Sequence, residues 1–138
     1  MQIEFPIEFI VHGTPVSQQA RRAASREEWK ERVRQASSGV LPSPHFAFEG
    51  AMSVTLYYLP PEVMEGDIDN IIKPVLDALS RLVYIDDRQV ERIVAQKFDP
   101  MRQVEFGRQT DLFRKAVEGA RPALYIRVSS DPTEDFVE

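Results

Sequence analysis

One stretch of 25 residues, GDIDNIIKPVLDALSRLVYIDDRQV (66–90), constrains the fold more than any other part of the chain. Its middle repeats apolar residues at helical spacing, with Ile72, Leu76 and Leu79 on one stripe, so this helix must be substantially buried on that side. Pro74 lies close to the helix start, where backbone N–H groups lack intrahelical partners. We therefore expect some distortion of the first turn and no break.

Segments with strand patterns lie on both sides of this helix. Residues 52–58, MSVTLYY, alternate between two faces and lead to Pro60-Pro61, which cannot continue a β-ladder. Residues 90–98, VERIVAQKF, are rich in branched side chains and favour another strand. After the intervening helix, this later strand could return alongside the earlier one.

The remaining segments complete an alternating order of strands and helices. Ile3 to Val11 show period-two alternation, with Pro6 favouring an edge position or a sheet entry. Ser25 and Glu28 form a capping-box pattern for a helix that stops near Gly39. A capped helix at 110–119 and a strand at 123–129 follow. The order β-α-β-α-β-α-β predicts an α+β (mixed α/β) fold, a small mixed β-sheet packed with helices.

Length and charge indicate one domain and an uneven surface. The chain has 138 residues, enough for one core, and we expect a single domain at 1–130 followed by a flexible acidic tail at 131–138. The net charge is −5, but the tail carries four acids, so residues 1–130 carry only −1. Residues 21–34 hold six Arg or Lys against three Glu. The overall acidity therefore does not exclude a polyanionic partner.

The sequence contains no cysteine, so disulfides and thiolate metal sites are excluded, and any metal must rest on oxygen or histidine ligands. The N-terminus, MQIEFPIEFIVHG, lacks a basic region followed by a continuous apolar run. No apolar stretch approaches the roughly 20 residues needed to cross a bilayer. We expect a cytoplasmic protein with no membrane contact.

Two acids one residue apart begin the central stretch. If residues 66–69 are extended, side chains at i and i+2 point the same way, and the carboxylates of Asp67 and Asp69 face one point in space. Lys73 follows Asp69 by four residues, so its ammonium group lies over the same face at the helix start.

A second acidic pair, Asp86 and Asp87, falls in the turn before the strand at 90–98. A strand that returns beside the earlier one could carry Asp87 back to the first pair. Converging carboxylates repel each other, and a divalent cation removes that cost. An all-oxygen site suits Mg²⁺ or Mn²⁺ and is typical of phosphoryl chemistry, in which Lys73 would balance charge on the phosphate.

Spacing alone is equally compatible with a structural interpretation of the same acids. Asp67 or Asp69 could cap the helix while the other favours its dipole, each contributing about 1 kcal/mol. Asp86 and Asp87 could belong to an ordinary turn. Asp77, in mid-helix and off the apolar stripe, is expected to be a solvated residue.

The motif resembles the RusA family of Holliday-junction resolvases, the crossover junction endodeoxyribonucleases. The family hallmark is D-[LIV]-D-N-x-x-K, a leucine-rich helix containing D-A-L, and then D-D-x-Q-[VI]. The matching segments are DIDNIIK (67–73), LDAL (76–79) and DDRQV (86–90), and GTPVSQQARR (13–22) is similar to the polar loop after the family's first strand. The composite motif is specific, and the resemblance covers most of the first hundred residues.

The resemblance implies a homodimeric, Mg²⁺-dependent endodeoxyribonuclease of mixed α/β fold that cuts four-way junctions symmetrically. Mn²⁺ is a possible substitute. Carried over by position, the metal ligands would be Asp67, Asp69 and Asp87, with Asp86 a nearby candidate and Lys73 an assisting cation. A two-fold dimer with one metal site per subunit can cut two strands of a two-fold junction.

This sequence departs from the family at its basic residues. Some members carry a basic run before the first aspartate, whereas LPPEVMEG (59–66) has two Glu and no base. Arg21, Arg22 and Arg26 are the best substitutes for contacts to DNA phosphates, although solvated arginines are nearly as consistent with the pattern. Residues 101–119 resemble a family-variable insertion of unassigned role.

Three other functions stay open at this point. The chain could be a DNA-binding module with a vestigial metal site, although the complete set of acids and lysine argues against it. It could be a metal-dependent nuclease or phosphodiesterase acting on another nucleic acid, an alternative that the acidic surface leaves open. It could also be a structural dimer without catalysis.

Overall fold

The computed structural model describes residues 1–138 except 17–22, 65, 105–106, 108–109 and 137–138. The elements, including 3₁₀ turns labelled η, are β1 (Ile7–His12), α1 (Ala23–Ser37), β2 (Met52–Leu59), η1 (Ile68–Ile71), α2 (Ile72–Leu79), η2 (Asp87–Gln89), β3 (Val90–Lys97), α3 (Asp111–Glu118), β4 (Ala123–Ser129) and η3 (Glu134–Phe136). This order confirms the predicted α+β class and the alternation of strands and helices.

The four strands form one mixed sheet in the order β1-β4-β2-β3. Strand β4 is antiparallel to both β1 and β2, whereas β2 and β3 are parallel. The parallel pair is the pair that η1 and α2 connect, so the predicted return of the later strand alongside the earlier one is confirmed. Both outer strands, β1 and β3, are edges of the described sheet.

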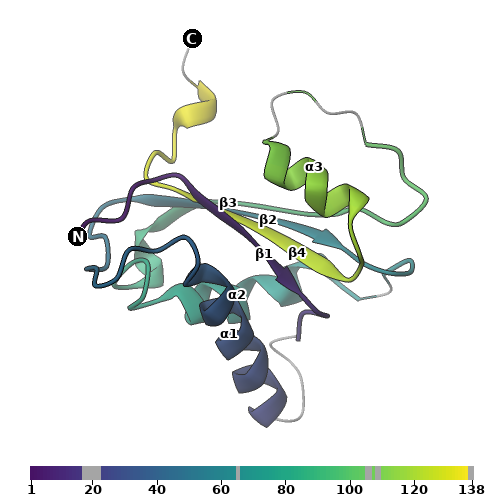
Figure 1. The fold of residues 1–138 in the computed structure, drawn as a ribbon, viewed down its shortest axis with the longest axis horizontal. Coiled ribbons are helices and arrows are strands. Elements are labelled where there is room, and N and C mark those ends of the chain that lie inside the picture. Colours follow the sequence, from purple (N-terminus) through teal and green to yellow (C-terminus); the bar gives the residue numbers. More distant parts are fainter. Residues whose placement is uncertain (17–22, 65, 105–106, 108–109, 137–138) are drawn as a thin grey trace.

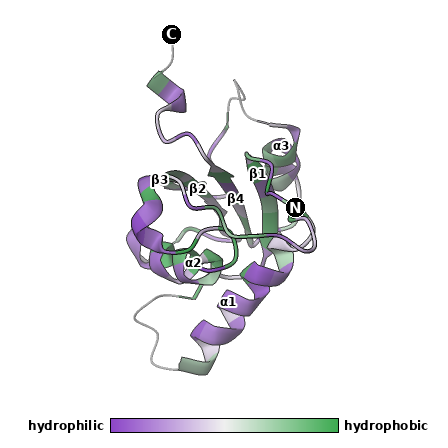
Figure 2. Ribbon diagram, turned by 90° about the vertical axis from the view of Figure 1, so that its left-hand side faces the viewer, coloured by the Kyte–Doolittle hydropathy of each residue, from purple (hydrophilic) through white to green (hydrophobic). Residues whose placement is uncertain are grey.

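Helices cover both faces of this sheet (Figure 1). The main core lies between one face and helices α1 and α2, and it includes Trp29 and Val33 of α1 with Val54 and Leu56 of β2. A second core lies under α3 on the opposite face. Figure 2 shows that α1 is largely hydrophilic along its length whereas α2 is mostly hydrophobic, in keeping with the deeper burial of α2.

The second core assigns a role to the segment at 101–119. Its helix α3 packs Phe113 against a group of aromatic rings from the sheet and its edge, with ring centroids 4.9 Å from Tyr57, 5.5 Å from Phe98 and 5.3 Å from Tyr125. Thr110 caps the helix as predicted, because its hydroxyl accepts a hydrogen bond from the Phe113 backbone N–H at 3.3 Å. Helix α3, within this segment, therefore covers part of the sheet face opposite α1 and α2.

Two predicted element starts differ from the structure. Strand β1 begins at Ile7 rather than Ile3, because Pro6 has no N–H to donate to a ladder; the edge position that Pro6 favours is confirmed. Helix α1 begins at Ala23, so Ser25 lies inside its first turn and the predicted capping box there is wrong.

The predicted distortion at the start of the central helix is confirmed. Residues 68–71 form the 3₁₀ turn η1, and the α-helical part begins only at Ile72. Pro74 is then the third residue of α2, where its missing N–H costs no intrahelical hydrogen bond. Among the described helices, none combines the length and the apolar character that a membrane span requires.

We predict that Phe113→Ala destabilises the fold by about 3–5 kcal/mol, because it removes the ring on which the second core is built. Urea unfolding followed by circular dichroism measures the loss. Lys115→Ala, at an exposed position of the same helix, is the matched control and should stay within about 0.5 kcal/mol of the wild type. Equal stability of the two variants would contradict the assigned role of α3.

Candidate active site

The first two aspartates flank the beginning of η1. Asp67 immediately precedes the turn with an extended backbone (φ −80°, ψ 134°), and its carboxylate makes no capping hydrogen bond. Its backbone oxygen accepts from the N–H of Asn70 at 3.2 Å. Asp69 already lies inside the turn, and both aspartates are exposed. The condition that residues 66–69 are extended therefore holds for Asp67 and not for Asp69, and the Asp67 carboxylate is not used as a helix cap.

A chain of ion pairs joins α1, α2 and η2. The ammonium of Lys73, the second residue of α2, lies 2.6 Å from Oδ2 of Asp87 and 2.9 Å from Oδ1 of Asp77. Oδ2 of Asp77 is also 3.8 Å from the ammonium of Lys30 on α1. The expectation that Asp77 is a solvated residue is wrong; it links two lysines, because α1 packs directly against α2.

These contacts set the protonation state of Lys73. The hydrogen bond to Asp87 is the largest cause that raises the pKa of the Lys73 ammonium, and the hydrogen bond to Asp77 is the next. A raised pKa keeps Lys73 positively charged throughout the neutral range. Lys73 is therefore suited to balance negative charge and unsuited to remove a proton.

The neighbouring acids Asp86 and Asp87 have different surroundings. Asp86 caps η2: its Oδ1 accepts from the N–H of Arg88 at 2.9 Å, and Oε1 of Gln89 accepts from the N–H of Asp86 at 3.0 Å. The hydrogen bond from the Arg88 backbone is the main cause that lowers the pKa of Asp86. Asp86 thus shapes the turn, and Asp87 faces Lys73.

Two residues that the sequence analysis did not single out hold this turn in place. The side-chain amide of Gln89 donates to the backbone oxygens of Phe48 at 2.7 Å and Gly50 at 2.8 Å. The buried Tyr84 hydroxyl donates to the Leu76 oxygen at 2.7 Å. The fixed Gln in the DDRQV motif is a signal for the first contact. Nothing local signals the second, because it depends on the folding back of residues 80–84.

Burial is the main cause that raises the pKa of the Tyr84 hydroxyl, and the negative charges of Asp87 and Asp77 raise this pKa further. The phenol therefore stays protonated beneath the ion-pair chain and keeps its hydrogen bond to α2. This contact fixes the distance between the helix and the segment that leads to Asp87.

The donor set fits a hard dication in chemistry, because Asp67, Asp69 and Asp87 offer only carboxylate oxygens near a water-accessible surface. The spacing of these side chains, however, does not by itself form a metal site. Among the residues that the structure describes, no three acidic or histidine side chains are grouped closely enough to hold a metal ion. The side chains of the three aspartates thus do not form a single ligand group in this arrangement, and Asp87 is instead compensated by Lys73.

Of the three candidate DNA-binding arginines, only one lies within the described part of the chain. Arg21 and Arg22 belong to the segment 17–22, outside the described residues. Arg26 is partly buried on α1, one helical turn before Lys30 and on the same side of the helix. Arg26 therefore borders the ion-pair chain.

The fold and the acidic surface together define a small α+β protein with an all-oxygen donor set beside a protonated lysine, an arrangement typical of phosphodiester chemistry. The family model of Endodeoxyribonuclease RusA matches residues 12–128. The chain belongs to this family, and the resemblance seen in the sequence is confirmed. Comparison with curated proteins finds no match.

We predict that Asp86→Ala lowers the midpoint of urea unfolding at neutral pH, whereas Asp86→Asn does so much less, because asparagine also caps a helical turn. The Asp86 carboxylate has a lowered pKa in the folded state. Its contribution is therefore present above the unfolded-state pKa of about 3.9 and is lost as the pH falls through the folded-state value. A difference between wild type and Asp86→Ala that persists unchanged at pH 2 would contradict this assignment.

Proposed function

We propose that the protein is a Mg²⁺-dependent endodeoxyribonuclease that acts in the cytoplasm and resolves four-way DNA junctions by symmetric hydrolysis of phosphodiester bonds. The observation that carries the proposal is the family match over residues 12–128, because that range contains the whole acidic motif and Lys73. The pairing of Lys73 with Asp87, residues 14 positions apart, supports a shared role for the two motif halves.

We assign Asp67, Asp69 and Asp87 as the residues that would hold the cation, with Asp86 as the alternative ligand and Mn²⁺ as a possible substitute. Mg²⁺ is usually bound by one or two carboxylates, waters and substrate phosphates, so a preformed group of three protein ligands is not required. When bound, the cation would supply a nucleophile from water at neutral pH and stabilise the leaving oxygen.

Lys73 has the complementary task. Its ammonium is protonated and half-exposed, so it can donate a hydrogen bond to a phosphate oxygen that approaches from solvent. Asp77 lies one helical turn further along α2 and holds the ammonium at 2.9 Å. We infer that Asp77 positions Lys73, and that Lys30 holds Asp77 in place.

A homodimer would give two such sites related by a two-fold axis, one for each strand to be cut. The edge strand β3 is available for this contact, because it pairs only with β2 in the described sheet and exposes Ile93. Exposed edge strands with apolar side chains favour association with a second chain.

We predict that Asp69→Asn and Asp87→Asn each abolish cleavage of a synthetic four-way junction in Mg²⁺, with at least a roughly hundredfold reduction of rate, because each removes a charged ligand. Folding and junction binding should stay nearly intact, since no carboxylate is needed to attract DNA. Asp111→Asn, the same change at an exposed position of α3 outside the acidic motif, is the matched control and should keep most of the activity. Cleavage at the wild-type rate by Asp69→Asn would refute the assignment of that residue.

The same assay separates the proposed substrate from its alternatives. Linear duplex, flap and single-stranded substrates are compared with the junction at equal concentration. Preferential cutting of the junction supports the proposal, preferential cutting of another substrate indicates a different nuclease, and binding without any cutting in Mg²⁺ or Mn²⁺ indicates a DNA-binding module.

We predict that replacing Arg21 and Arg22 together with alanine weakens junction binding and flattens its salt dependence, by about 0.9 in slope for each phosphate that the protein no longer neutralises. Fluorescence anisotropy at several salt concentrations measures both quantities. Replacing the exposed Arg102 and Lys115 with alanine changes the net charge equally and is the control. An unchanged slope for the Arg21 and Arg22 variant would remove these residues from the DNA-binding surface.

A further inference from the structure

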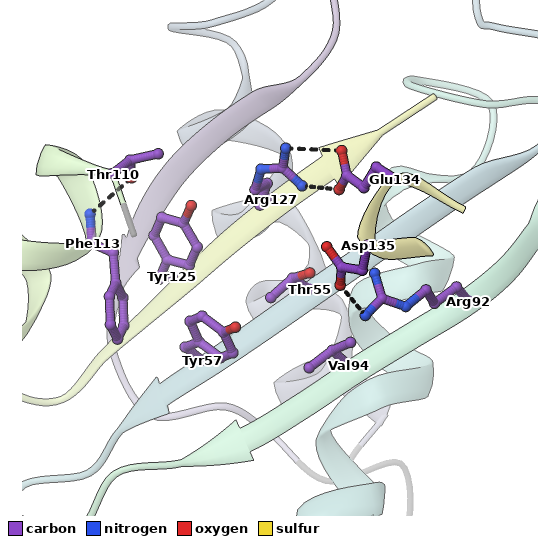
Figure 3. A pocket seen from close by; sticks show the side chains of 10 residues that line it. All are labelled: Thr55, Tyr57, Arg92, Val94, Thr110, Phe113, Tyr125, Arg127, Glu134 and Asp135. Atoms are coloured by element: carbon purple, nitrogen blue, oxygen red, sulfur yellow. Dashed lines mark hydrogen bonds and ion pairs between the residues drawn. The ribbon is translucent and has the colours of Figure 1, made fainter. Parts of the chain in front are cut away.

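A second polar site lies on the sheet face that carries α3, away from the ion pairs of α1 and α2. It is a cavity of about 350 Å³ lined by Thr55, Tyr57, Arg92, Val94, Thr110, Phe113, Tyr125, Arg127, Glu134 and Asp135 (Figure 3). The residues come from β2, β3, β4, the start of α3 and the C-terminal turn η3. None of them belongs to the acidic motif.

Two arginines form the positively charged end of this cavity. Arg127 of β4 is paired in register with Thr55 of β2, and Arg92 of β3 is paired with Ser53, two residues earlier on β2. Both guanidinium side chains are largely buried, with 26% and 27% of their surfaces exposed. Two cations held on one sheet face at this depth require anionic partners.

Consecutive acids of η3 supply those partners. The Glu134 carboxylate is held by both terminal nitrogens of Arg127 and by the Ser129 hydroxyl at 3.2 Å, and the Asp135 carboxylate pairs with Arg92. The pairing with Glu134 raises the pKa of Arg127 and lowers that of Glu134. Glu134 and Asp135, within the acidic segment at 131–138, thus contact the sheet through charged groups.

Apolar contacts contribute little to this attachment. No residue of η3 is buried, and the Phe136 side chain is 78% exposed. The carboxylates that hold this segment are partly open to solvent, with 26% of the Glu134 side chain and 60% of the Asp135 side chain exposed. Such a segment is weakened by salt and can be exchanged for another anion. This distinguishes η3 from α3, which is anchored by the aromatic rings of the second core.

The other end of the cavity is polar, and its hydroxyls already have partners within the protein. The hydroxyls of Thr110 and Tyr125 both donate to the same oxygen of Glu8 at 2.6 Å. An incoming anion therefore meets its strongest attraction at Arg92 and Arg127.

The two-pronged contact between Arg127 and Glu134 has the geometry that arginine also uses for phosphate. Because each arginine holds its own carboxylate, the site accommodates two anionic groups at once. This suits the repeating phosphates of a nucleic-acid strand better than a single phosphate ion. We propose that Arg92 and Arg127 form a binding site for the phosphates of a nucleic-acid strand, and that Glu134 and Asp135 occupy this site in the free protein.

The proposal rests on the proposed function only in the choice of nucleic acid as the ligand. It gives the acidic C-terminal segment a task, which is to compete with weakly bound polyanions. A tethered competitor acts at a local concentration of the order of millimolar, so only a strand that also binds elsewhere on the protein would displace it.

The test measures binding of a fluorescently labelled linear duplex in EDTA, so that neither cleavage nor junction recognition is involved. We expect E134Q/D135N to bind about tenfold more tightly than the wild type at low salt, with a salt dependence steeper by roughly two released counterions. E4Q/E49Q, which neutralises two exposed carboxylates outside the cavity, is the matched control and should change the affinity much less. Equal gains in the two variants would overturn the proposal, because net charge alone would then explain them.

Further variants test the arginines and the fold. Adding R92Q/R127Q to E134Q/D135N should return the affinity and the salt slope to the wild-type values; a retained gain would exclude the arginines.

Thermal unfolding shows whether each variant is folded. Removal of residues 131–138 repeats the binding test without introducing new side chains. If millimolar inorganic phosphate raises the unfolding temperature of E134Q/D135N as much as the oligonucleotide does, the site is a phosphate-ion site and the nucleic-acid proposal fails. Because no arm of this test involves cleavage, failure of the proposed junction-cutting function and failure of this binding site can be told apart.

Discussion

The parallel pairing of β2 with β3 determines where the candidate active site can lie. Parallel neighbours need a crossover, and here the crossover is η1 and the short helix α2. Eight residues of α-helix span only about 12 Å, so both ends of the crossover stay near each other. Lys73 near the start of α2 can therefore meet Asp87, the first residue of η2, because residues 80–84 fold back along the helix.

Two lysines compensate the like charges of this acidic surface. Asp77 and Asp87 lie close enough to share one ammonium group, and the second lysine, Lys30, stabilises Asp77 from the neighbouring helix. The arrangement is partly open to solvent, so each exposed ion pair contributes little to folding. Its importance is geometric: the two lysines fix the positions of the Asp77 and Asp87 carboxylates relative to each other.

Local signals in the sequence predict much of the fold. The strand at 123–129 and the helix capped by Thr110 follow from the sequence with their bounds, because alternation and capping are local properties. The false capping box at Ser25 shows the limit of such signals, since a four-residue pattern also occurs within a helix. The parallel return of β3 could be proposed from the sequence, whereas the position of β4 between β1 and β2 could not, because strand order depends on long-range pairing.

In the candidate active site, too, the sequence predicts what depends on local patterns and not what depends on long-range contacts. The motif identifies the acids and Lys73, but only the folded chain separates Asp86, which caps a turn, from Asp87, which meets the lysine. The link between Lys30 and Asp77 joins residues on different helices, and no spacing rule predicts it.

The uneven charge of the chain has a structural explanation in this fold. The sheet separates an acidic surface beside α2 from a pair of arginines under η3, and Glu134 and Asp135 of η3 pair with those arginines. The net charge of −5 is a sum over the whole sequence and does not show which of these charges a partner can reach. Because these carboxylates are held by charge at an exposed turn, the potential that a polyanion meets depends on whether that turn is in place. Net charge alone is thus a poor guide to whether this protein binds nucleic acid.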